Sequence, residues 1–494
     1  MGAGMLIAGA VGAPFVAAVL TLIRQREAEV WSYAAALLAA VATVALLPGA
    51  MAGSVQELSL LPLVPDLDVV FRVDPLGLTF ALLASGLWIV TTVYSSGYVR
   101  ADRLENRPRY FAAFATSIGA AMGVAFAGNL LTFFLFYELL TLATYPLVVH
   151  KESDEAFAAG RRYLLFALGG GLALLAGIVW AWQLAGTLEF TPGGFLGGSA
   201  GAPAGLFVLL VAGVAVKAAV MPVHAWLPAA MVAPTPVSAL LHAVAVVKAG
   251  VFGMLRVLGY TFGPESLAGF AGPQILAAGA GATILIGSVI AIRQDNLKRR
   301  LAYSTVVHLS YIVLGAALLA PFGFTGATVH MVNHGLAKIT LFFCAGAIYV
   351  TAHKENVSEL GGLGHRMPWT FGAFTVGSLG LVGTPGLSGF VSKFFLGRGA
   401  IQAGELTALA IMLGASLLTA TYLLPIVRIA FFPRADELED GESDDPHGEA
   451  RPALVVPLVV TAVLVVVFGL VPGAMAVQHD LATAAAARVF GGLP

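Results

Sequence analysis

The chain alternates between long apolar runs and short segments that hold most of its charged side chains. A helix needs roughly 20 mostly apolar residues to cross the hydrocarbon core of a bilayer, because each residue adds about 1.5 Å. Windows of this length predict about fourteen membrane spans, so the expected fold class is an all-α polytopic membrane protein. The predicted spans cover residues 3–23, 30–48, 75–97, 110–128, 129–149, 163–185, 205–221, 237–257, 271–292, 301–320, 324–349, 368–395, 404–432 and 453–473.

Two of these spans contain residues that interrupt helices. In span seven, KAAVMPVHAWLPAAMVAPTPVSALLH places four prolines after Lys217, and in span twelve, GLVGTPGLSGFVSKFF places glycines and a proline before Lys393. Proline removes a backbone donor and clashes with the preceding turn, so both helices are predicted to be broken. The breaks lie five spans apart, and a five-helix unit emerges inverted relative to its successor. We therefore predict two inverted five-helix repeats, spans 4–8 and 9–13, each with a broken helix.

This pattern divides the chain into four parts. The first three transmembrane helices occupy residues 1–109, the first repeat residues 110–260 and the second repeat residues 261–432. A cytoplasmic loop and a last transmembrane helix occupy residues 433–494. The two halves share no visible residue-level identity, so the repeat is predicted from the positions of the breaks alone.

Lysine and arginine side chains concentrate in every second loop. The segments DRLENRPR (102–109) and RQDNLKRR (293–300) are examples, whereas four arginines lie at or beyond the opposite helix ends. The positive-inside rule places the basic loops in the cytoplasm, so both termini are expected on the outer side of the membrane. The four outer arginines are Arg72, Arg256, Arg398 and Arg488.

Composition supports a membrane protein and narrows its chemistry. Hydrophobic residues make up 59% of the 494 and charged residues 11%, which is too apolar for a soluble fold of this length. A formal net charge of -1 without a basic tract argues against nucleic-acid binding. The single cysteine, Cys344, excludes an intramolecular disulfide and a cysteine-ligated cluster. No phosphate-binding glycine loop stands out, and we expect no cofactor in this chain.

A small set of ionisable side chains falls within the apolar spans. A charge near the bilayer centre costs about 2.5–3.5 kcal/mol on insertion scales, so such residues need partners and often mark pathways. The basic members of the set are lysines and histidines, and a lysine, unlike an arginine, can release its proton when burial lowers its pKa. The set is Glu138, Lys217, His242, Lys248, His330, His334, Lys338 and Lys393.

The segment ATVHMVNHGLAKITLFF holds three members of this set at intervals of four residues. His330, His334 and Lys338 therefore share one face of a helix. Histidines at i and i+4 can bind zinc, but this segment adds only a lysine, which repels cations, and we expect no metal site. Imidazole has a pKa near 6.5 and carries protons well, so we favour a proton relay, with hydrogen-bonded structural histidines as the alternative.

Glu138 needs a buried partner, and Lys217 is the candidate. A salt bridge between them could simply hold two helices together. Alternatively the pair could act as a gate that keeps Lys217 protonated while closed and weakens its hold on the proton when open. His242 shares a span with Lys248 and is a further relay candidate. For His224 in HAWLP, a direct role and a backbone-capping role remain equally open.

Six motifs taken in order resemble those of the antiporter-like subunits shared by respiratory complex I and the multisubunit Mrp-type cation/proton antiporters. The resemblance covers nearly the whole chain and implies a fourteen-helix fold with polar residues along the membrane midplane. It also implies that Glu138 and Lys217 correspond to the family's glutamate–lysine pair and Lys248 to its central lysine. The motifs are DPLG, NLLTFFLFYELLTLATY, KAAVMPVHAWLPAAMVAPTPVSALLHAVAVVKAG, DNLKRRLAYSTVVHLSY, HMVNHGLAKITLFF and GTPGLSGFVSKF.

The same resemblance assigns the remaining residues. His330, His334 and Lys338 correspond to the stretch that connects two half-channels, and Lys393 to the residue towards the second half-channel. The chain would then be a proton-translocating subunit that catalyses no chemistry of its own. Some members carry glutamate where Lys393 stands, and only a short tail follows the last predicted span, which together favour the D-type Mrp subunit.

The resemblance implies a location and partners as well. We expect a prokaryotic cell (inner) membrane, other membrane subunits of a hetero-oligomeric complex, the lipid bilayer, protons and sodium ions. A proton-pumping subunit of a complex I-type NADH:quinone oxidoreductase or of a membrane-bound hydrogenase is the first alternative, and the chain would then be part of a translocase. A structural scaffold subunit is the second.

Overall fold

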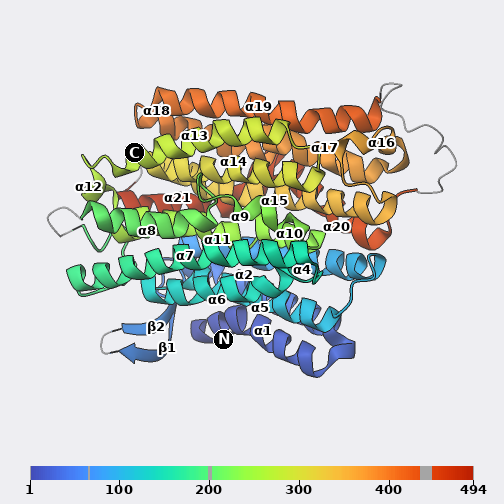
Figure 1. Cartoon of the computed structure of the whole chain (residues 1–494). Helices are drawn as coiled ribbons and strands as arrows, with labels where there is room; N and C mark the ends of the chain where they lie inside the picture. Colours follow the sequence, from blue (N-terminus) through green and yellow to red (C-terminus); the bar gives the residue numbers. More distant parts are fainter. Residues whose placement is uncertain (1, 65–66, 198–202, 434–447, 493–494) are drawn as a thin grey trace.

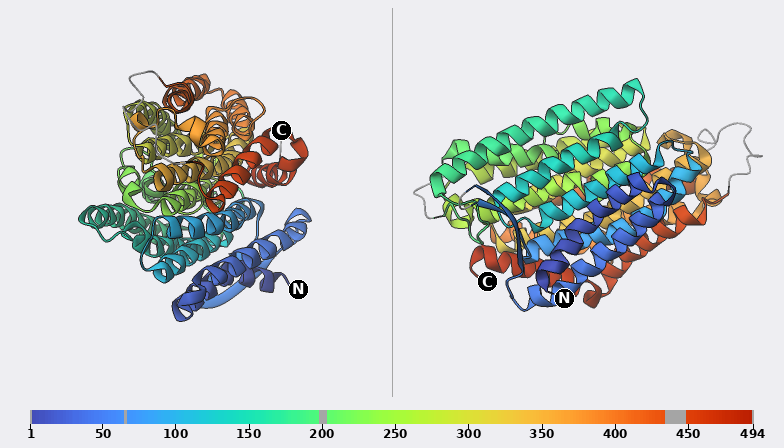
Figure 2. Two further views of the ribbon diagram at one scale, coloured as in Figure 1. Left: turned by 90° about the vertical axis from the view of Figure 1, so that its right-hand side faces the viewer. Right: turned by 90° about the horizontal axis from the view of Figure 1, so that it is seen from below.

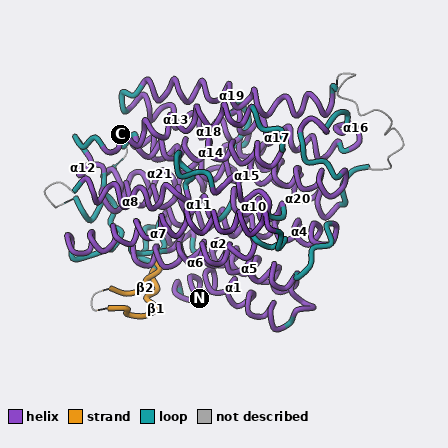
Figure 3. The backbone as a smooth tube through the Cα atoms, in the orientation of Figure 1, coloured by secondary structure: helices purple, strands orange, loops and turns teal. Residues whose placement is uncertain are grey.

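The computed structural model describes residues 2–64, 67–197, 203–433 and 448–492. Long helices run side by side along one common direction, and a two-stranded hairpin lies at an edge of the bundle (Figure 1, Figure 3). Eleven helices within these ranges are long and apolar enough to cross a membrane. The prediction of an all-α polytopic membrane protein is confirmed.

Each predicted span is occupied by a helix or by a pair of helices. The spans outside the group of eleven are α8, which is short, the interrupted pair α17 and α18, and α14, whose apolar residues are mixed with Arg300 and His308. In chain order the helices are α1 (Ala3–Ile23), α2 (Ala28–Ala45) with α3 (Leu47–Met51), α4 (Pro75–Ala101), α5 (Arg107–Phe126), α6 (Leu130–Val148), α7 (Asp154–Ala185), α8 (Ala204–Lys217), α10 (Thr235–Ala243) with α11 (Val246–Arg256), α13 (Gly272–Ile292), α14 (Leu297–Ala317), α15 (Pro321–Ala352), α17 (Pro368–Val382) with α18 (Ser388–Gln402), α19 (Leu406–Phe431) and α20 (Pro452–Leu470).

Shorter elements connect these helices or follow them. The α-helical ones are α9 (Trp226–Ala229), α12 (Pro264–Leu267), α16 (Leu363–Arg366) and α21 (Ala476–Phe490). A π-helix, η3 (Val257–Phe262), continues α11, and the 3-10 turns are η1 (Gln25–Glu27), η2 (Ala230–Val232), η4 (Val357–Glu359) and η6 (Pro472–Met475). α21 follows the last predicted span and packs against α15 and α4.

Both predicted helix breaks are present. α8 ends at Lys217, and the chain is irregular until α9 begins. α17 and α18 are separated by residues 383–387, in which Gly383 and Gly386 have φ values of +89° and +86° that favour glycine. Each break therefore lies beside a lysine, Lys217 in the last turn of α8 and Lys393 near the start of α18.

Span eight is also interrupted, which the sequence pattern did not predict. α10 ends at Ala243 and α11 begins at Val246, with Lys248 in the first turn of α11. No proline or glycine marks this break. The carbonyl of Ala243 faces Gly335 of α15, where a Cβ would stand 3.0 Å from that oxygen. The span predicted at 237–257 is present, and no local residue marks its break, which lies where α10 packs against α15.

Residues 49–72, which connect the second and third predicted spans, contain an antiparallel hairpin of β1 (Glu57–Val64) and β2 (Leu67–Arg72). The hairpin packs on the start of α6. The amide of Val70 donates to Thr132 Oγ1 at 3.1 Å, and the side chain of Asn129 donates to the carbonyl of Asp68 at 2.8 Å. Buried and exposed residues do not alternate along β2, so the period of two that signals a strand is missing from the sequence.

α15 is the central helix of the bundle. It contacts α4, α10, α14, α17, α18, α20 and α21, and all its side chains from Gly323 to Ile348 are buried. The end-on view shows the N-terminal helices α1 and α2 and the late helix α19 on opposite sides of this interior (Figure 2). The histidines and the lysine of α15 therefore lie inside the protein rather than against lipid.

The positions of the broken spans fit the predicted five-helix groups. The fourth span of each group is interrupted, α8 in the first and α17 with α18 in the second, and in the first group the fifth span, α10 with α11, is interrupted as well. The third spans, α7 and α15, both have 32 residues. The division at 1–109, 110–260, 261–432 and 433–494 stays a prediction, and residues 434–447 of its last part lie outside the described residues.

Candidate functional site

The first element of the site is an ion pair between α6 and α8. Glu138 Oε1 lies 4.0 Å from Lys217 Nζ, and the Lys217 side chain is only 1% exposed. The same ammonium donates to the carbonyl of Tyr137 and lies 3.4 Å from the centre of the Tyr137 ring. Neither carboxylate oxygen of Glu138 has a hydrogen-bond partner within the described ranges, so the carboxylate depends on Lys217 for stabilisation.

Backbone features hold this pair in place. Because α8 ends at Lys217, the negative end of the helix dipole lies at the ammonium and favours its charged form. The carboxylate of Glu138 also packs against Gly171 of α7, where a Cβ would stand 2.6 Å from Oε1. Only glycine leaves room for the carboxylate at this point.

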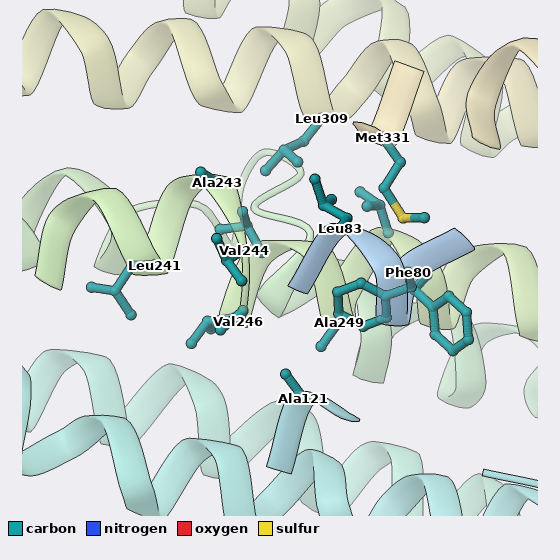
Figure 4. Packing of buried hydrophobic residues seen from close by; sticks show 14 of the residues in the cluster. Phe80, Leu83, Ala121, Leu241, Ala243, Val244, Val246, Ala249, Leu309 and Met331 are labelled. Carbon is teal, nitrogen blue, oxygen red and sulfur yellow. The ribbon is translucent and has the colours of Figure 1, made fainter. Parts of the chain in front are cut away.

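Lys248 and His334 form the second element. Lys248 Nζ lies 2.6 Å from His334 Nδ1, and both side chains are at most 1% exposed. The break between α10 and α11 puts Lys248 at this depth, and Figure 4 shows apolar side chains of α4, α5, α14 and α15 around Val244 and Val246 at the break. An ammonium can donate to Nδ1 only if that nitrogen is unprotonated, so a protonated Lys248 requires His334 to accept at Nδ1.

A third histidine, on α14, extends this contact. The ring of His308 lies 5.5 Å from the ring of His334 and 5.5 Å from the ring of His330, close to parallel with both. His308 Nδ1 is 3.3 Å from His330 Nε2, and His330 Nδ1 is 2.8 Å from Ser392 Oγ on α18. We call Lys248, His334, His308, His330 and Ser392 the central row. The central row connects Lys248 on α11 to Ser392 on α18, which belongs to the broken span twelve. Every group in the row can bind a proton.

Sequence analysis missed His308 as a site residue. It lies in the motif DNLKRRLAYSTVVHLSY, which was used only for the family resemblance. The available signal was an ionisable residue within a predicted span, the same signal that selected His330 and His334. Its place between those two rings depends on how α14 packs against α15, which no local pattern reveals.

Lys393 lies next to the end of the central row. Its ammonium donates to the carbonyls of Leu381 and Val382 at 2.8 and 2.9 Å, and to Ser416 Oγ at 2.9 Å. The carbonyls are those freed at the end of α17 by the helix break. Lys393 Nζ also lies 5.1 Å from the centre of the Tyr311 ring, which stacks on His308 at 5.5 Å. The Tyr311 ring thus contacts both Lys393 and a histidine of the central row.

Lys338, His242 and His224 lie outside the central row. Lys338 Nζ donates to Ser304 Oγ and, at 2.9 Å, to the carbonyl of Leu301. The ring of His242 lies 4.7 Å from that of Phe342. His224 lies beside the α8 break, with its ring 6.1 Å from that of Tyr303 on α14. Over the described ranges no three His, Cys, Asp or Glu side chains gather in a way that could hold a metal ion.

The pair at Glu138 and the central row are joined through the backbone rather than by side chains. Gly250, two residues after Lys248, packs so closely on the backbone of Lys217 and Ala218 that a Cβ would overlap it. The end of α8 and the start of α11 therefore cannot move independently.

Arg256, expected at an outer helix end, is fully buried. Its Nη1 lies 2.5 Å from Oδ2 of Asp74, whose Oδ1 accepts from the amide of Gly77 at the start of α4. Aromatic rings, including Tyr260 at 4.6 Å, surround the guanidinium. Because arginine keeps its proton, this pair is a structural clamp between α4 and α11.

The fold and this interior define a class of protein: a multi-pass membrane protein whose buried core carries lysines and histidines in contact with one another. The chain matches the family model described as "NADH:quinone oxidoreductase/Mrp antiporter, TM" over residues 127–419. It belongs to this family.

Similar proteins come from both branches that the family's description names. The N subunit of the NADH-quinone oxidoreductase of Desulforudis audaxviator is 31% identical over 419 residues, covering 82% of this chain and 83% of that protein. The A/B subunit of a probable K(+)/H(+) antiporter of Rhizobium meliloti is 33% identical over 426 residues, covering 83% of this chain but only 41% of that protein. The structure of the Mrp complex from Dietzia sp. matches with a TM-score of 0.85 at 24% identity, covering 98% of each chain, which shows a shared fold.

Proposed function

We propose that this chain is the proton-translocating subunit of a multisubunit Mrp-type antiporter that exchanges protons for sodium or another monovalent cation. The observation that carries the proposal is the central row. From Lys248 to Ser392, each group lies within hydrogen-bonding or ring-contact distance of the next, in the interior of an apolar bundle. Burying this many ionisable groups within membrane spans costs free energy. Such residues typically mark ion or proton pathways.

Protons would enter near Lys217, pass to Lys248 and along the histidines, and leave near Lys393. While the pair with Glu138 is closed, its negative charge favours a protonated Lys217. When the pair opens, that stabilisation is lost and the proton moves on. Neighbouring cations repel one another, so loading one site discourages loading the next, and the proton positions are coupled. Lys338 would contribute its charge to this coupling from beside the row.

The antiporter relative supports this function, as does the shared fold with the Mrp complex. In such an assembly proton influx would drive sodium export, with other membrane subunits as partners. We place the chain in a prokaryotic cell membrane with its basic loops in the cytoplasm and both termini outside. The choice of the D-type subunit stays a prediction, since the Rhizobium antiporter relative is of the A/B type and this chain spans only 41% of its length.

A proton-pumping subunit of a redox-driven complex is the second candidate. The likeness to the N subunit of an NADH-quinone oxidoreductase, which this chain covers over 83% of its length, favours it specifically. The same central row would then conduct protons pushed by electron transfer in partner subunits. A structural scaffold is the third reading, and it predicts that the buried charges tolerate neutral substitutes of similar size.

The deciding experiment uses inverted membrane vesicles containing the chain together with its genomic neighbours. A pH-sensitive dye reports proton movement after addition of NaCl, and separately after addition of NADH. We expect a sodium-triggered signal that is lost in Lys393→Ala. A signal that appears only with NADH would assign the chain to a redox-driven pump, and an unchanged sodium-triggered signal in Lys393→Ala would contradict the proposed path.

A further inference from the structure

α10 carries three polar side chains on one face. Thr235, Ser238 and His242 are spaced by three and then four residues, which places them in line along the helix. Each of the three is fully buried. The helix rises by about 10 Å from Thr235 to His242, so the line runs from the start of α10 deep into the bundle.

Two members of this line lack protein partners for their polar atoms. Ser238 Oγ and both ring nitrogens of His242 make no hydrogen bond to any described residue. Many buried hydroxyls in this bundle are satisfied by their own helix, as Ser288 Oγ is by the carbonyl of Ile284 at 2.7 Å, whereas Ser378 and Ser388 share the lack of a partner with Ser238. Buried polar atoms that stay unpaired cost about 1–3 kcal/mol each, and ordered water is the usual partner that offsets this cost.

The start of the line reaches the basic-loop end of the bundle. Thr235 Oγ1 lies 3.4 Å from the hydroxyl of Tyr98 on α4, and the Tyr98 side chain lies close enough to the carboxyl of Asp102, at the end of α4, to interact with it electrostatically. Nearby, Lys298 Nζ donates to the carbonyl of Ala233, just before α10, at 3.3 Å. Burial raises the pKa of the Asp102 carboxyl. The positive charge of Lys151 and the interaction with Tyr98 lower this pKa, but burial has the larger effect. This carboxyl therefore binds a proton more readily than an exposed aspartate does.

The inner end of the line lies among the lysines of the site. The ring of His242 rests against Phe342, one turn of α15 beyond Lys338. Lys338 and Lys248 are both close enough to act electrostatically on His242. A proton that reaches His242 therefore lies beside the central row and beside the lysine that flanks it.

We infer that Asp102, Tyr98, Thr235, Ser238 and His242, together called the α10 branch, form a water-lined access route from the basic-loop side to Lys338 and Lys248. At each hydroxyl an incoming proton binds the oxygen as the hydroxyl's own proton leaves towards the next group, so no group keeps a net charge. Protons would then reach Lys338 and Lys248 by a second path, while transport along the central row would still require the Glu138–Lys217 pair as its gate. The use of these protons rests on the proposed function, whereas the existence of the route does not.

Water access is tested with single cysteines in the assembled complex. Cys344 is the only native cysteine and is replaced by alanine, after which Ser238→Cys and the control Ser288→Cys are introduced separately. Both positions are fully buried helical serines, but only Ser238 lies on the α10 branch. Silver ions are added from the basic-loop side, and the thiols left unreacted are alkylated after denaturation and counted by mass spectrometry. We expect Ser238→Cys to react at least tenfold faster than Ser288→Cys, and equal rates would overturn the route.

A second measurement tests transport without cysteine chemistry. The double variant Thr235→Val, Ser238→Ala removes both hydroxyls with little change of shape, and Ser288→Ala is the matched control. We expect at least a fivefold lower initial rate of proton movement in the double variant and a normal rate in the control. A wild-type rate in the double variant would overturn the route. Failure of the proposed function can be told apart from failure of the route. It would show as a wild-type rate of proton movement in Lys217→Ala and Lys393→Ala, while the silver reaction of Ser238→Cys stays unaffected.

Discussion

Replacing Gly171 by alanine perturbs the Glu138–Lys217 pair without removing either charge. The new Cβ would stand 2.6 Å from Glu138 Oε1, whereas ordinary contact begins at 3.4 Å, so the carboxylate must retreat by about 0.8 Å. Two unit charges 4.0 Å apart attract by about 4 kcal/mol at an effective dielectric constant of about 20. A retreat directly away from Lys217, the direction that gives the largest loss, weakens this attraction by about 0.7 kcal/mol. That loss corresponds to about a threefold change in the protonated population of Lys217.

We therefore expect Gly171→Ala to transport protons about threefold more slowly than wild type, because a weaker pair holds the loading site less firmly. The assay is the initial rate of dye response in inverted vesicles, normalised to the amount of assembled complex. Gly169→Ala is the matched control, since it lies on the same helix and its Cβ would meet nothing within 4 Å. Equal rates in the two alanine variants would refute the gate, and the pair would then be a structural bridge.

Further predictions test other parts of the site and the fold. Lys217→Ala should abolish proton movement while the complex still assembles, as judged by native gel. His308→Leu removes the link between the two α15 histidines and should slow transport by about tenfold or more, and a normal rate would remove it from the pathway. Asp74→Asn leaves Arg256 buried without its counter-charge and should lower the free energy of unfolding by about 3–5 kcal/mol, seen as a fall in Tm of the detergent-solubilised protein. Hydrogen bonding from the Asn356 amide lowers the pKa of Glu359, so its contribution to stability is complete above the ordinary carboxyl range and is lost as pH falls through the lowered value. The protection of that loop against hydrogen exchange, measured relative to the intrinsic rate at each pH, should then fall.

The sequence by itself determined the class of fold and most of the candidate residues. Apolar runs long enough to cross a bilayer predict helices reliably, because backbone groups in lipid must bond within their own segment. The same physics makes a buried lysine or carboxylate conspicuous, which is why Glu138, Lys217 and Lys248 could be selected without a structure. Proline and glycine likewise marked the breaks beside Lys217 and Lys393.

The tertiary structure decided which of these residues touch one another. The break before Lys248 carries no local signal and follows from the approach of α10 to α15 at Gly335. The way α14 packs against α15 decides two contacts. It places His308 against His330 in the central row, and it places Ser304 where the Lys338 ammonium donates to it, outside the row. Helical periodicity fixes which side chains share a face, whereas contacts between helices depend on packing of whole surfaces, and that information is spread over residues far apart in the chain.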